Sequence, residues 1–584
     1  MKLKSYWPMT LGLTIQPVLA EAVLPEVTVK GTIDVQEERR MASAAKTIID
    51  RKEIEATDAS TVAELLNKLP MTGMFMEPPM GGVPKRGQGG RPQNRNMPQI
   101  LVDGQPLGGG SNMGTVMRLP VELIERVEII RNSTPEFLVT SPAGVINIIL
   151  KDVPKQLTRN AKLTSFVADD RLGVRADGQY GQSQDNYGYL WAAAADSKPQ
   201  IGERITKIND ISQAQNSQET TQQTGRDNNL SVSPRFNLKL QNNQQIIISP
   251  FVAYNQDQRD AYTQRSLNIV NQELDSTDGE RLTGRLITEW KQQGQQNNEQ
   301  SIKLFVQAED ENTDKTTYQT LQTANQLTYQ ENTDRTEREL ALDGRIKSIF
   351  LETHIVSSGF EWRTKNTKEQ LFKQQLLSND SNIKEQRMAL WWQDEWLLSE
   401  KHTVTYGLRW QQFDNQINDT QQGFIEQKED TFAPSIHYLW QPNEQWNIRA
   451  SLAQHQRPAR ASELSSVLRT ASGVNSSSNP DRAGNPQLAN EKQYSVELGI
   501  EHYLPQKAGN LSLSVFERQV SDYVQRLTLL ENSRWLERPY NVGDARLRGI
   551  LFDSKVQLNA LQLPNLTARA SYAYSQNTLT DAVA

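Results

Sequence analysis

Methionine is concentrated in one short region of this chain, between positions 71 and 117, which is otherwise rich in Gly, Pro and Asn. A thioether is a soft ligand that suits Cu(I), so the region is a candidate copper site. Clustered methionines also form adaptable apolar surfaces without a metal, and the absence of Cys and His from the region favours this second interpretation. Seven of the chain's 11 methionines lie here, namely Met71, Met74, Met76, Met80, Met97, Met113 and Met117, and the first four are the candidate copper ligands.

The rest of the composition excludes several other kinds of chemistry. The chain of 584 residues contains no Cys, which removes disulfides, thiolate metal sites and Cys nucleophiles and suits export through an oxidising periplasm. We find no Ser-His-Asp order, metal-ligand spacing or phosphate-binding loop above chance, and no basic stripe that would bind nucleic acid. We therefore expect no enzymatic activity, no resident cofactor and no nucleic-acid partner.

Three apolar, strand-like runs with charges at fixed places must position the methionine region. They begin at Ile100, Ile124 and Gly144 and read ILVDGQPL, IERVEIIR and GVINIILK. Their order and spacing resemble the plug domain of TonB-dependent outer-membrane receptors. The resemblance implies an α+β plug domain inside a large antiparallel transmembrane β-barrel, in the outer membrane of a Gram-negative bacterium. It also implies an energised importer of a scarce ligand, which contacts outer-membrane lipid and acts as a monomer.

The N-terminus is typical of a secreted protein. A positive start at Lys2 and Lys4 precedes a weakly apolar core and small residues, which predicts a signal peptide over residues 1–20, or 1–22. Changes of composition predict the other boundaries. They give a linker at 21–40, the plug domain at 41–154 and the β-barrel at 155–584.

A short β-prone segment of the linker resembles the TonB box. Such a box would bind TonB by strand addition, in which backbone hydrogen bonds supply most of the affinity. The resemblance therefore implies a partnership with the TonB-ExbB-ExbD energy-coupling complex. The residues of the box are Glu26, Val27, Thr28 and Val29.

A helix is expected near the start of the plug. Thr61 and Glu64 have the spacing of a capping box, and Pro70 would end the helix. The apolar positions between them share one helical face, so we expect a core position for Val62, Leu65, Leu66 and Leu69.

From about residue 155 onward, apolar and polar residues alternate in runs of roughly the 10 residues that a tilted membrane strand uses. One face of each strand would meet lipid and the other the lumen, which is consistent with a mean hydropathy of −0.65. A soluble β-sandwich array is the alternative, but it would not explain the preceding plug motifs. Clear runs lie at 301–309, 403–410, 446–452 and 494–501.

Two further features suit the outer parts of a barrel. Tryptophans near the ends of the runs predict an interfacial girdle, namely Trp290, Trp410, Trp446 and the adjacent pair Trp391 and Trp392. Long stretches rich in Gln, Asn, Thr and Asp separate the runs. We expect these stretches to be extracellular loops that become ordered on ligand binding, at 212–229, 312–337 and 457–490.

The resemblance also implies a charge lock, in which two plug arginines pair with two barrel glutamates. Arg86 and Arg131 stand at the matching plug positions, and Glu497 matches the first barrel acid. The alternation of its strand directs Glu497 into the lumen. A charge buried there needs a partner, because losing one member of a buried pair costs about 3–5 kcal/mol.

The chain departs from the family pattern at two places near this lock. At the position of the second acid it has Leu551, and Asp553 lies two residues further along the same face. We expect either that Asp553 replaces the missing acid or that the lock has one acid. After Arg131, where the family pattern continues with Gly and Pro, the chain has Asn132 and Ser133.

The resemblance implies a 22-stranded barrel, the size of the plugged outer-membrane transporters. The region 155–584 is short for this architecture and stops in a loop-like sequence without the usual terminal aromatic residue. We expect the last strands to be missing from this chain. A passive pore or a non-functional fragment is the alternative of a different class.

A ferric siderophore is the expected ligand, because its uptake is the main activity of the family. Copper, cobalamin or a saccharide are alternatives. Haem is disfavoured, because no His lies between Arg457 and Leu488, where some relatives place a haem ligand. The side chains expected to line the pocket floor are Met74, Met76, Arg91, Gln93, Asn94 and Asn112.

Overall fold

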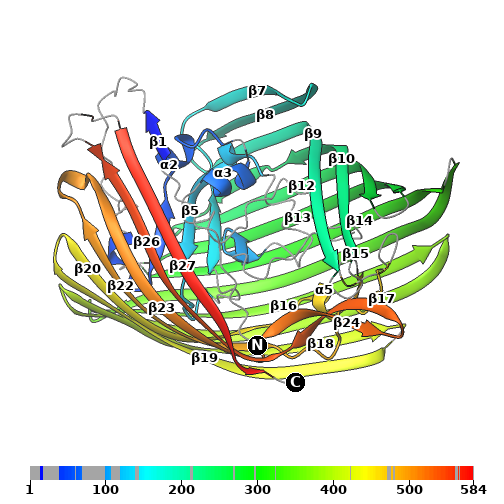
Figure 1. Ribbon diagram of the computed structural model, residues 1–584. Coiled ribbons are helices and arrows are strands. Elements are labelled where there is room, and N and C mark those ends of the chain that lie inside the picture. Colours follow the sequence, from blue (N-terminus) through cyan, green and yellow to red (C-terminus); the bar gives the residue numbers. More distant parts are fainter. Residues whose placement is uncertain are drawn as a thin grey trace.

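The computed structural model shows a small α+β unit inside the curve of one large, mostly antiparallel sheet (Figure 1). This arrangement confirms the predicted fold class of a plug within a large β-sheet of the barrel type. Among the residues that the structure describes, no helix is both long and apolar enough to cross a bilayer. The structure describes residues 14–17, 39–59, 61–68, 99–106, 119–137, 144–210, 215–266, 270–294, 298–321, 324–420, 422–469, 475, 477, 480–558, 563 and 566–582.

The large sheet is a meander in which successive strands pair antiparallel. Its strands are β1 (Thr14–Pro17), β7 (Thr158–Ala168), β8 (Arg171–Ser183), β9 (Tyr187–Asp210), β10 (Gln215–Val232), β11 (Arg235–Lys239), β12 (Gln244–Ser266), β13 (Val270–Gln293), β14 (Glu299–Leu321), β15 (Ala324–Phe350), β16 (His354–Lys373), β17 (Leu376–Ser399), β18 (His402–Asp419), β19 (Gly423–Asn443), β20 (Trp446–Arg457), β22 (Glu491–Tyr503), β23 (Gly509–Ser521), β26 (Gly543–Gln557) and β27 (Leu566–Ala582).

The described part of the chain contributes 19 strands to this sheet, fewer than the 22 of the architecture that the resemblance implies, from which we expected the last strands to be missing. Two of them, β10 and β11, are pieces of one strand, since both pair with β9 and β12. The interruption falls at Pro234, which has no N–H to give to the ladder. β1 lies within the predicted signal peptide and pairs antiparallel with β27.

The two ends of the large sheet differ in their connections. One end, called here the turn end, carries the short connections 351–353, 400–401 and 444–445. The other, called the loop end, carries the long connections 458–490 and 522–542. In transmembrane barrels the short turns face the periplasm and the longer loops face the outside. By this rule we expect the turn end on the periplasmic side.

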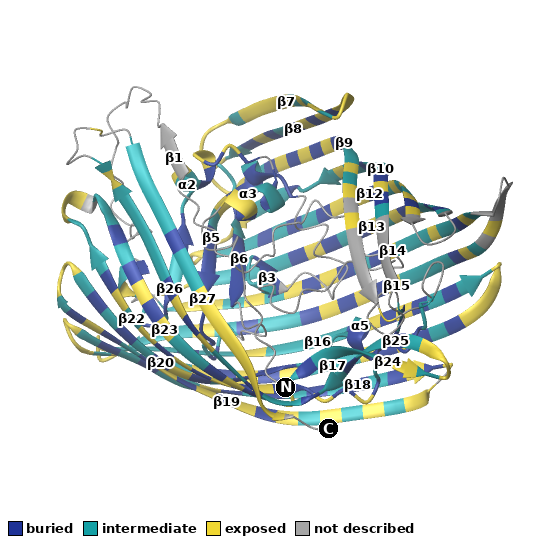
Figure 2. Cartoon of the chain, in the orientation of Figure 1, coloured by how far each residue is buried: buried dark blue, intermediate teal, exposed yellow. Residues whose placement is uncertain are grey.

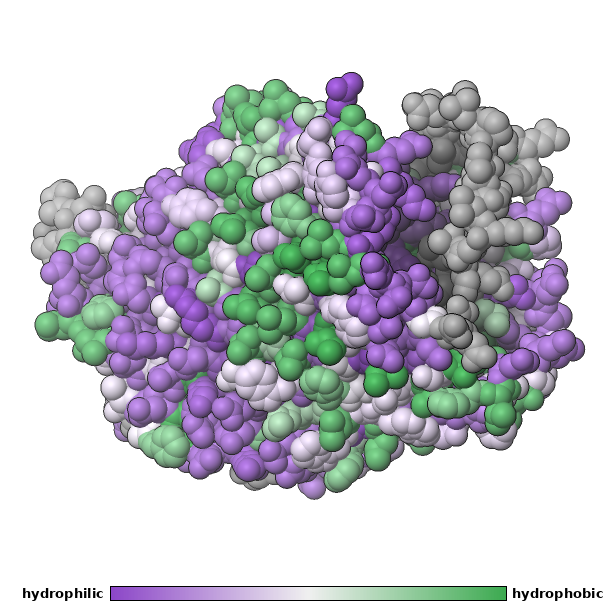
Figure 3. Space-filling view, turned by 180° about the vertical axis from the view of Figure 1, so that it is seen from behind, coloured by the Kyte–Doolittle hydropathy of each residue, from purple (hydrophilic) through white to green (hydrophobic). Residues whose placement is uncertain are grey.

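Exposure alternates along the strands with the predicted period of two, as the striped strands in Figure 2 show. On β14, the outward Ile302, Leu304 and Val306 are 39–48% exposed. Their neighbours Phe305 and Gln307 face inward and are at most 2% exposed. The rear surface in Figure 3 accordingly has a hydrophobic zone across its middle with hydrophilic zones on either side.

Two of the three stretches predicted as loops are strands instead. Residues 215–232 form β10, and residues 312–321 and 324–337 belong to the paired strands β14 and β15. The backbone ladder of these two strands continues to the pair Leu321 and Ala324, although its side chains there are polar. Polar composition misled the prediction because strand ends beyond the apolar zone need no lipid-facing residues.

In the third stretch, 457–490, Arg457 ends β20, and the described residues that follow contain two short elements, α5 (Ala461–Leu464) and β21 (Asp481–Arg482). β21 joins β24 (Val524–Glu531) and β25 (Arg534–Asn541) in a three-stranded sheet. This unit, called here the cap, lies at the loop end (Figure 1). It packs against the inner wall through a buried cluster of Ile383, Ile417, Ala459, Ala461, Leu464, Leu488 and Val524.

The predicted tryptophan pair points to opposite faces of the sheet. Trp392 is 41% exposed on the outward face, whereas Trp391 is 7% exposed and faces inward. Adjacent residues of a strand always alternate in this way, so only Trp392 can belong to a girdle. The prediction for Trp391 was therefore wrong.

The plug is a mixed five-stranded sheet in the order β2-β5-β6-β3-β4. The predicted helix is confirmed as α3, and its Glu64 N–H donates to Thr61 Oγ1 at 3.3 Å. Its apolar face joins a core that also includes wall residues Ala192, Phe251 and Ala253. The elements are β2 (Lys46–Ile49), α2 (Arg51–Glu55), α3 (Val62–Lys68), β3 (Gln99–Val102), β4 (Gln105–Pro106), a 3-10 turn (Val121–Leu123), β5 (Ile124–Ile130) and β6 (Val145–Leu150); a second 3-10 turn, Pro505–Lys507, precedes β23.

The assignment of the two faces predicts opposite effects of one added charge. We expect Leu304→Arg, which places a cation on the outward face, to lower the free energy of unfolding in phospholipid vesicles by about 2–4 kcal/mol. Ser301→Arg on the inward face of the same strand is the matched control, and we expect less than about 1 kcal/mol. Urea titration followed by tryptophan fluorescence measures both. Equal effects would contradict the assignment.

Candidate functional site: contacts between the plug and the barrel

Three of the residues predicted from the sequence as site residues lie in the described part of the chain, namely Arg131, Glu497 and Asp553. The contacts between the plug and the inner wall are therefore the site that the structure presents. The other predicted site residues lie outside the described residues: Glu26, Val27, Thr28, Val29, Met71, Met74, Met76, Met80, Arg86, Arg91, Gln93, Asn94 and Asn112.

The plug segment that follows β5 begins with the predicted arginine. Arg131 Nη2 lies 3.5 Å from Glu497 Oε1. Asn132 Nδ2 donates to the other carboxylate oxygen, Oε2, at 3.1 Å. All three side chains are under 10% exposed. The departure from the family pattern at position 132 therefore adds a second donor to the same carboxylate.

The next residues of this segment contact two other barrel strands. His437 of β19 lies with Nε2 3.1 Å from the Ser133 carbonyl. A carbonyl oxygen only accepts, so Nε2 carries the proton. Arg409 Nη1 of β18 donates to the Pro135 carbonyl at 3.1 Å. These contacts spread residues 131–137, called here the lock segment, across a wide arc of the wall.

The lock segment ends in a second ion pair with the wall. Glu136 Oε1 lies 2.7 Å from Arg345 Nη1 of β15. Burial raises the pKa of Glu136 above its ordinary value, and the nearby Arg345 opposes that rise. The carboxylate form of Glu136 is thus more dependent on its arginine than an exposed glutamate would be.

A second set of contacts holds residues 39–46, the start of the described plug. Arg449 of β20 donates to three backbone carbonyls, those of Arg39 at 3.1 Å, Arg40 at 3.2 Å and Ala42 at 2.9 Å. Its Nη1 also lies 2.5 Å from Glu501 Oε2. Glu501 pairs with Arg39 as well, at 3.5 Å. One barrel cation and one barrel anion thus anchor the segment that follows the linker.

Sequence reasoning missed Glu501, although its position was informative. It lies four residues after Glu497 on β22 and therefore on the same inward face. Among the described residues, Glu501 is the second barrel carboxylate that an arginine of the plug region reaches, and Asp553 has no such ion pair. Arg86 lies outside the described residues, so a pairing of Asp553 with Arg86 stays a prediction.

The tight turn between β3 and β4 makes a third set of contacts. Asp103 has φ 49° and Gly104 has φ 77°, both in the left-handed region. Asp103 Oδ2 lies 3.0 Å from Arg235 Nη1, and Lys303 Nζ donates to the Asp103 carbonyl at 2.8 Å. Two wall strands, β11 and β14, therefore hold this turn by its backbone and by its acid.

The last residue of the turn is held from both sides. Gln105 Nε2 donates to Asp343 Oδ2 at 2.6 Å. Its Oε1 accepts from Arg363 Nη2 at 2.8 Å. The turn is therefore fixed by hydrogen bonds to four wall strands in all, and no apolar contact is needed to explain its position. Residues 103–105 are called here the plug turn.

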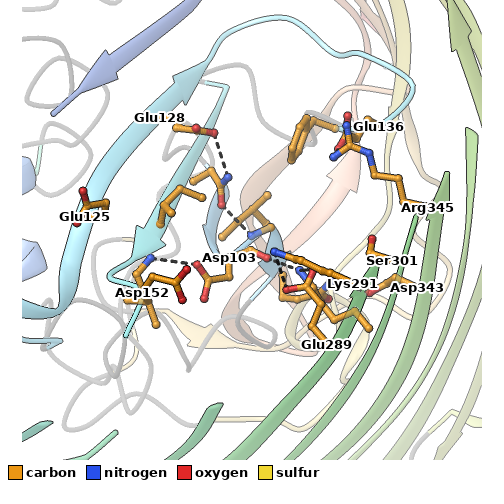
Figure 4. A pocket seen from close by; sticks show the side chains of 18 of the residues that line it. Asp103, Glu125, Glu128, Glu136, Asp152, Glu289, Lys291, Ser301, Asp343 and Arg345 are labelled. Carbon is orange, nitrogen blue, oxygen red and sulfur yellow. Dashed lines mark hydrogen bonds and ion pairs between the residues drawn. The ribbon is translucent and has the colours of Figure 1, made fainter. Parts of the chain in front are cut away.

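A polar cavity of about 980 Å³ lies beside the plug turn, between the plug sheet and the wall (Figure 4). Desolvation lowers the pKa of Lys151, which lines it. The barrel residues that line it come from near the turn end of their strands. Charges of both signs surround it: Asp103, Glu125, Glu128, Glu136, Asp152, Glu289, Lys291, Asp343 and Arg345 (Figure 4).

A resident metal centre is not visible in the described ranges, where no group of three or more His, Asp or Glu is arranged to hold an ion. The arrangement instead provides ion pairs, hydrogen bonds and a polar cavity. Such groups can hold two protein parts together and exchange their partners for water. Polar contacts of this kind suit a plug that can move relative to the wall.

Two family models match the chain and together span most of it. The model described as TonB dependent receptor-like, beta-barrel, matches residues 160–584. The model described as TonB-dependent Receptor Plug Domain matches residues 38–145.

One similar curated protein is the iron-regulated outer membrane virulence protein of Vibrio cholerae serotype O1. It is 20% identical over 563 residues, which cover 92% of this chain and 76% of that protein. Among solved structures, the ferric citrate transporter FecA is 15% identical with a TM-score of 0.62, over 94% of this chain and 80% of that one. The ferripyoverdine receptor of Pseudomonas aeruginosa is 12% identical, also with a TM-score of 0.62, over 93% of this chain and 72% of that one. The structural likeness shows a shared fold.

The lock segment predicts a measurable effect of Glu497. Because the chain has no Cys, Ser133→Cys can report how often the lock segment leaves the wall. Glu497→Ala leaves Arg131 buried without its partner, at about 3–5 kcal/mol. We therefore expect maleimide labelling of Ser133→Cys to accelerate at least about tenfold, since each 1.4 kcal/mol is a factor of ten.

Glu517→Ala is the matched control for this experiment. Glu517 is a barrel carboxylate on β23 that pairs with Arg548 at a more exposed position. We expect it to leave the labelling rate unchanged. The interpretation of the lock segment fails if the Glu497 and Glu517 variants label at the same rate.

Proposed function

The chain belongs to the family of TonB-dependent receptors, and from that membership we propose that it imports a ferric siderophore across the outer membrane of a Gram-negative bacterium. The import would be coupled to energy by a rearrangement of the plug. The observation that carries the proposal is the anchoring of residues 39–46 to the wall by Arg449 and Glu501. A pull on the chain ahead of this anchor must break it before any other described contact of the plug.

The partner that would pull is the TonB-ExbB-ExbD complex. The predicted box, Glu26 to Val29, precedes the anchored segment by about ten residues of linker. Strand addition gives TonB a hold on the backbone of the box that does not depend on its side chains. Tension along the linker reaches Arg39 and Arg40 first, where Arg449 holds their carbonyls.

The cavity beside the plug turn supports a route for the ligand. The polar lining gives a hydrophilic chelate groups to exchange with water. The plug turn is held by hydrogen bonds and ion pairs rather than by apolar packing, and Asp103 and Arg235 are 17% and 13% exposed. Release of the plug turn would widen the cavity without removing any of the plug core around α3.

The choice of ligand rests on the relatives and on the predicted pocket floor. The similar proteins include a ferric citrate transporter and a ferripyoverdine receptor. Cationic and amide side chains suit an anionic ferric chelate, and we propose Arg91, Gln93, Asn94 and Asn112, with Met74 and Met76, as the pocket floor.

Copper is a second candidate ligand. The observation that favours it is the concentration of methionine between positions 71 and 117. In that case the thioethers of Met71, Met74, Met76 and Met80 would bind Cu(I). Cobalamin and saccharides remain further alternatives without an observation that favours them.

Deletion of residues 24–31 tests energy coupling. We expect uptake of the ligand to fall to background, because TonB loses its strand partner, whereas binding at the cell surface persists. Radiolabelled ligand measures both quantities on the same cells. A deletion of equal length at 31–38 of the linker is the control for chain shortening. Uptake that is unaffected by the first deletion would indicate a passive pore.

Growth assays test the ligand. In an iron-limited strain that lacks its own siderophore receptors, we expect this protein to restore growth with at least one of a panel of ferric siderophores. Arg91→Ala should weaken that rescue, because it removes a cation from the pocket floor. Rescue under copper limitation alone, lost in Met74→Ala and Met76→Ala, would contradict the siderophore and establish the copper alternative.

A further inference from the structure

Three of the chain's five histidines form a regular pattern on the outward face at the turn end. Each stands directly opposite a tryptophan of the neighbouring strand. Their ring centroids are 5.3, 6.2 and 4.3 Å apart. The pairs occupy six successive strands of the sheet, β16 to β20 and β22, and are His354 with Trp396, His402 with Trp440, and His502 with Trp446; together they are called here the His–Trp band.

The alternation of the strands fixes the direction in which the band points. Trp392, Leu408 and Leu498 share the face of the band on their strands and are 41–54% exposed. The inward residues beside them, such as Arg409 and Glu497, are at most 4% exposed. The band therefore lies on the side of the sheet that faces lipid in a membrane, at its periplasmic boundary.

A carboxylate lies within this outward surface. An aromatic girdle at a membrane boundary requires no carboxylate. Asp394 follows Trp392 by two residues and precedes Trp396 by two, so it shares their face, yet it is only 4% exposed. Its Oδ2 accepts from Tyr406 OH at 2.9 Å and lies 2.8 Å from His354 Nδ1. Its Oδ1 is buried and has no hydrogen-bond partner.

A second buried polar atom on the same outward face, His502 Nδ1, has no hydrogen-bond partner. An ionisable group on a lipid-facing surface is expensive unless something pairs with it, and an ordinary aromatic girdle needs only Trp and Tyr at this depth. We therefore expect a polar partner from outside the chain to bind the polar groups on this face, which are Asp394, Tyr406 and the imidazoles of the band.

The position of the band determines which partner can reach it. Molecules at the boundary of the periplasmic leaflet are phospholipids, with acyl chains at the depth of Leu390 and Leu408 and headgroups at the depth of the histidines. A headgroup with a phosphate and a primary ammonium group offers both charges that the band lacks. The ammonium would donate to Asp394 Oδ1, and the phosphate would accept from imidazole N–H groups.

We propose that the His–Trp band binds phospholipid from the periplasmic leaflet, and that Asp394 selects headgroups with a primary ammonium group, as in phosphatidylethanolamine. The inference rests on membrane insertion of the sheet, which the proposed function shares. It does not depend on TonB or on the identity of the imported ligand. A failure of the lipid-binding inference can therefore be distinguished from a failure of the proposed import function.

Competition between two zwitterionic lipids tests the proposal. The full protein, purified in detergent, is incubated with equal amounts of phosphatidylethanolamine and phosphatidylcholine, which differ in whether the ammonium can donate hydrogen bonds. Native mass spectrometry counts the lipids that remain bound. We expect phosphatidylethanolamine to be retained at least about fivefold over phosphatidylcholine.

Variants separate the role of the acid from that of the histidines. Asp394→Asn keeps the shape but removes the charge, and we expect it to abolish the preference. His502→Gln should reduce the retention of both lipids while the preference remains. Glu517 is a carboxylate elsewhere on the wall that is 34% exposed, and Glu517→Gln should change neither. Native barrel mobility on gels identifies any variant that has not folded. If Asp394→Asn does not fold, the retention of both lipids by His502→Gln is the test of the band.

Several outcomes would overturn the inference. They are equal retention of the two lipids by the unaltered protein, an unchanged preference in Asp394→Asn, and a preference for anionic phosphatidylglycerol over both zwitterionic lipids. A protein that copurifies on this surface and is displaced by no lipid would also overturn it. A normal lipid preference with no ligand uptake would leave the inference standing and count against the proposed function alone.

Discussion

A charge that is closed off from water between the plug and the wall must meet an opposite charge, and this requirement decides how the two parts fit. Losing one member of a buried pair costs several kcal/mol, more than most apolar contacts supply. Arg131 therefore seats against Glu497, and Arg39 and Arg449 share Glu501. The plug is not held by its hydrophobic core alone but by matched groups that water can also satisfy. Such contacts hold the plug in place and can still be exchanged for contacts with water when the plug is pulled.

Much of the fold could be predicted because the relevant signals are local. The period of two along β14 and β22 gives the direction of each side chain, and three short motifs give the plug sheet. The strand β10 and the paired strand ends at 312–321 and 324–337 were missed, because backbone pairing there continues where composition no longer requires it. Trp391 was misassigned because adjacent residues of a strand point to opposite faces, so that only Trp392 faces outward.

The site was less predictable, because its geometry depends on residues far apart in the chain. Glu497 could be identified from its motif, but Glu501 acts through Arg449 and a segment more than 400 residues away. The plug turn looked like part of a strand motif, and nothing in its sequence indicates the partners Arg235 and Asp343. The alternation along each strand indicates the direction of these side chains but not which charges meet.

Arg449 holds the start of the plug by three backbone carbonyls and not by side chains. A guanidinium that binds the main chain is indifferent to which amino acids supply it. This contact therefore places no constraint on the side chains at positions 41 and 42, whereas any change of Arg449 disturbs the whole anchor. Selection falls on the barrel half of this contact, so related proteins should differ on one side of it and agree on the other.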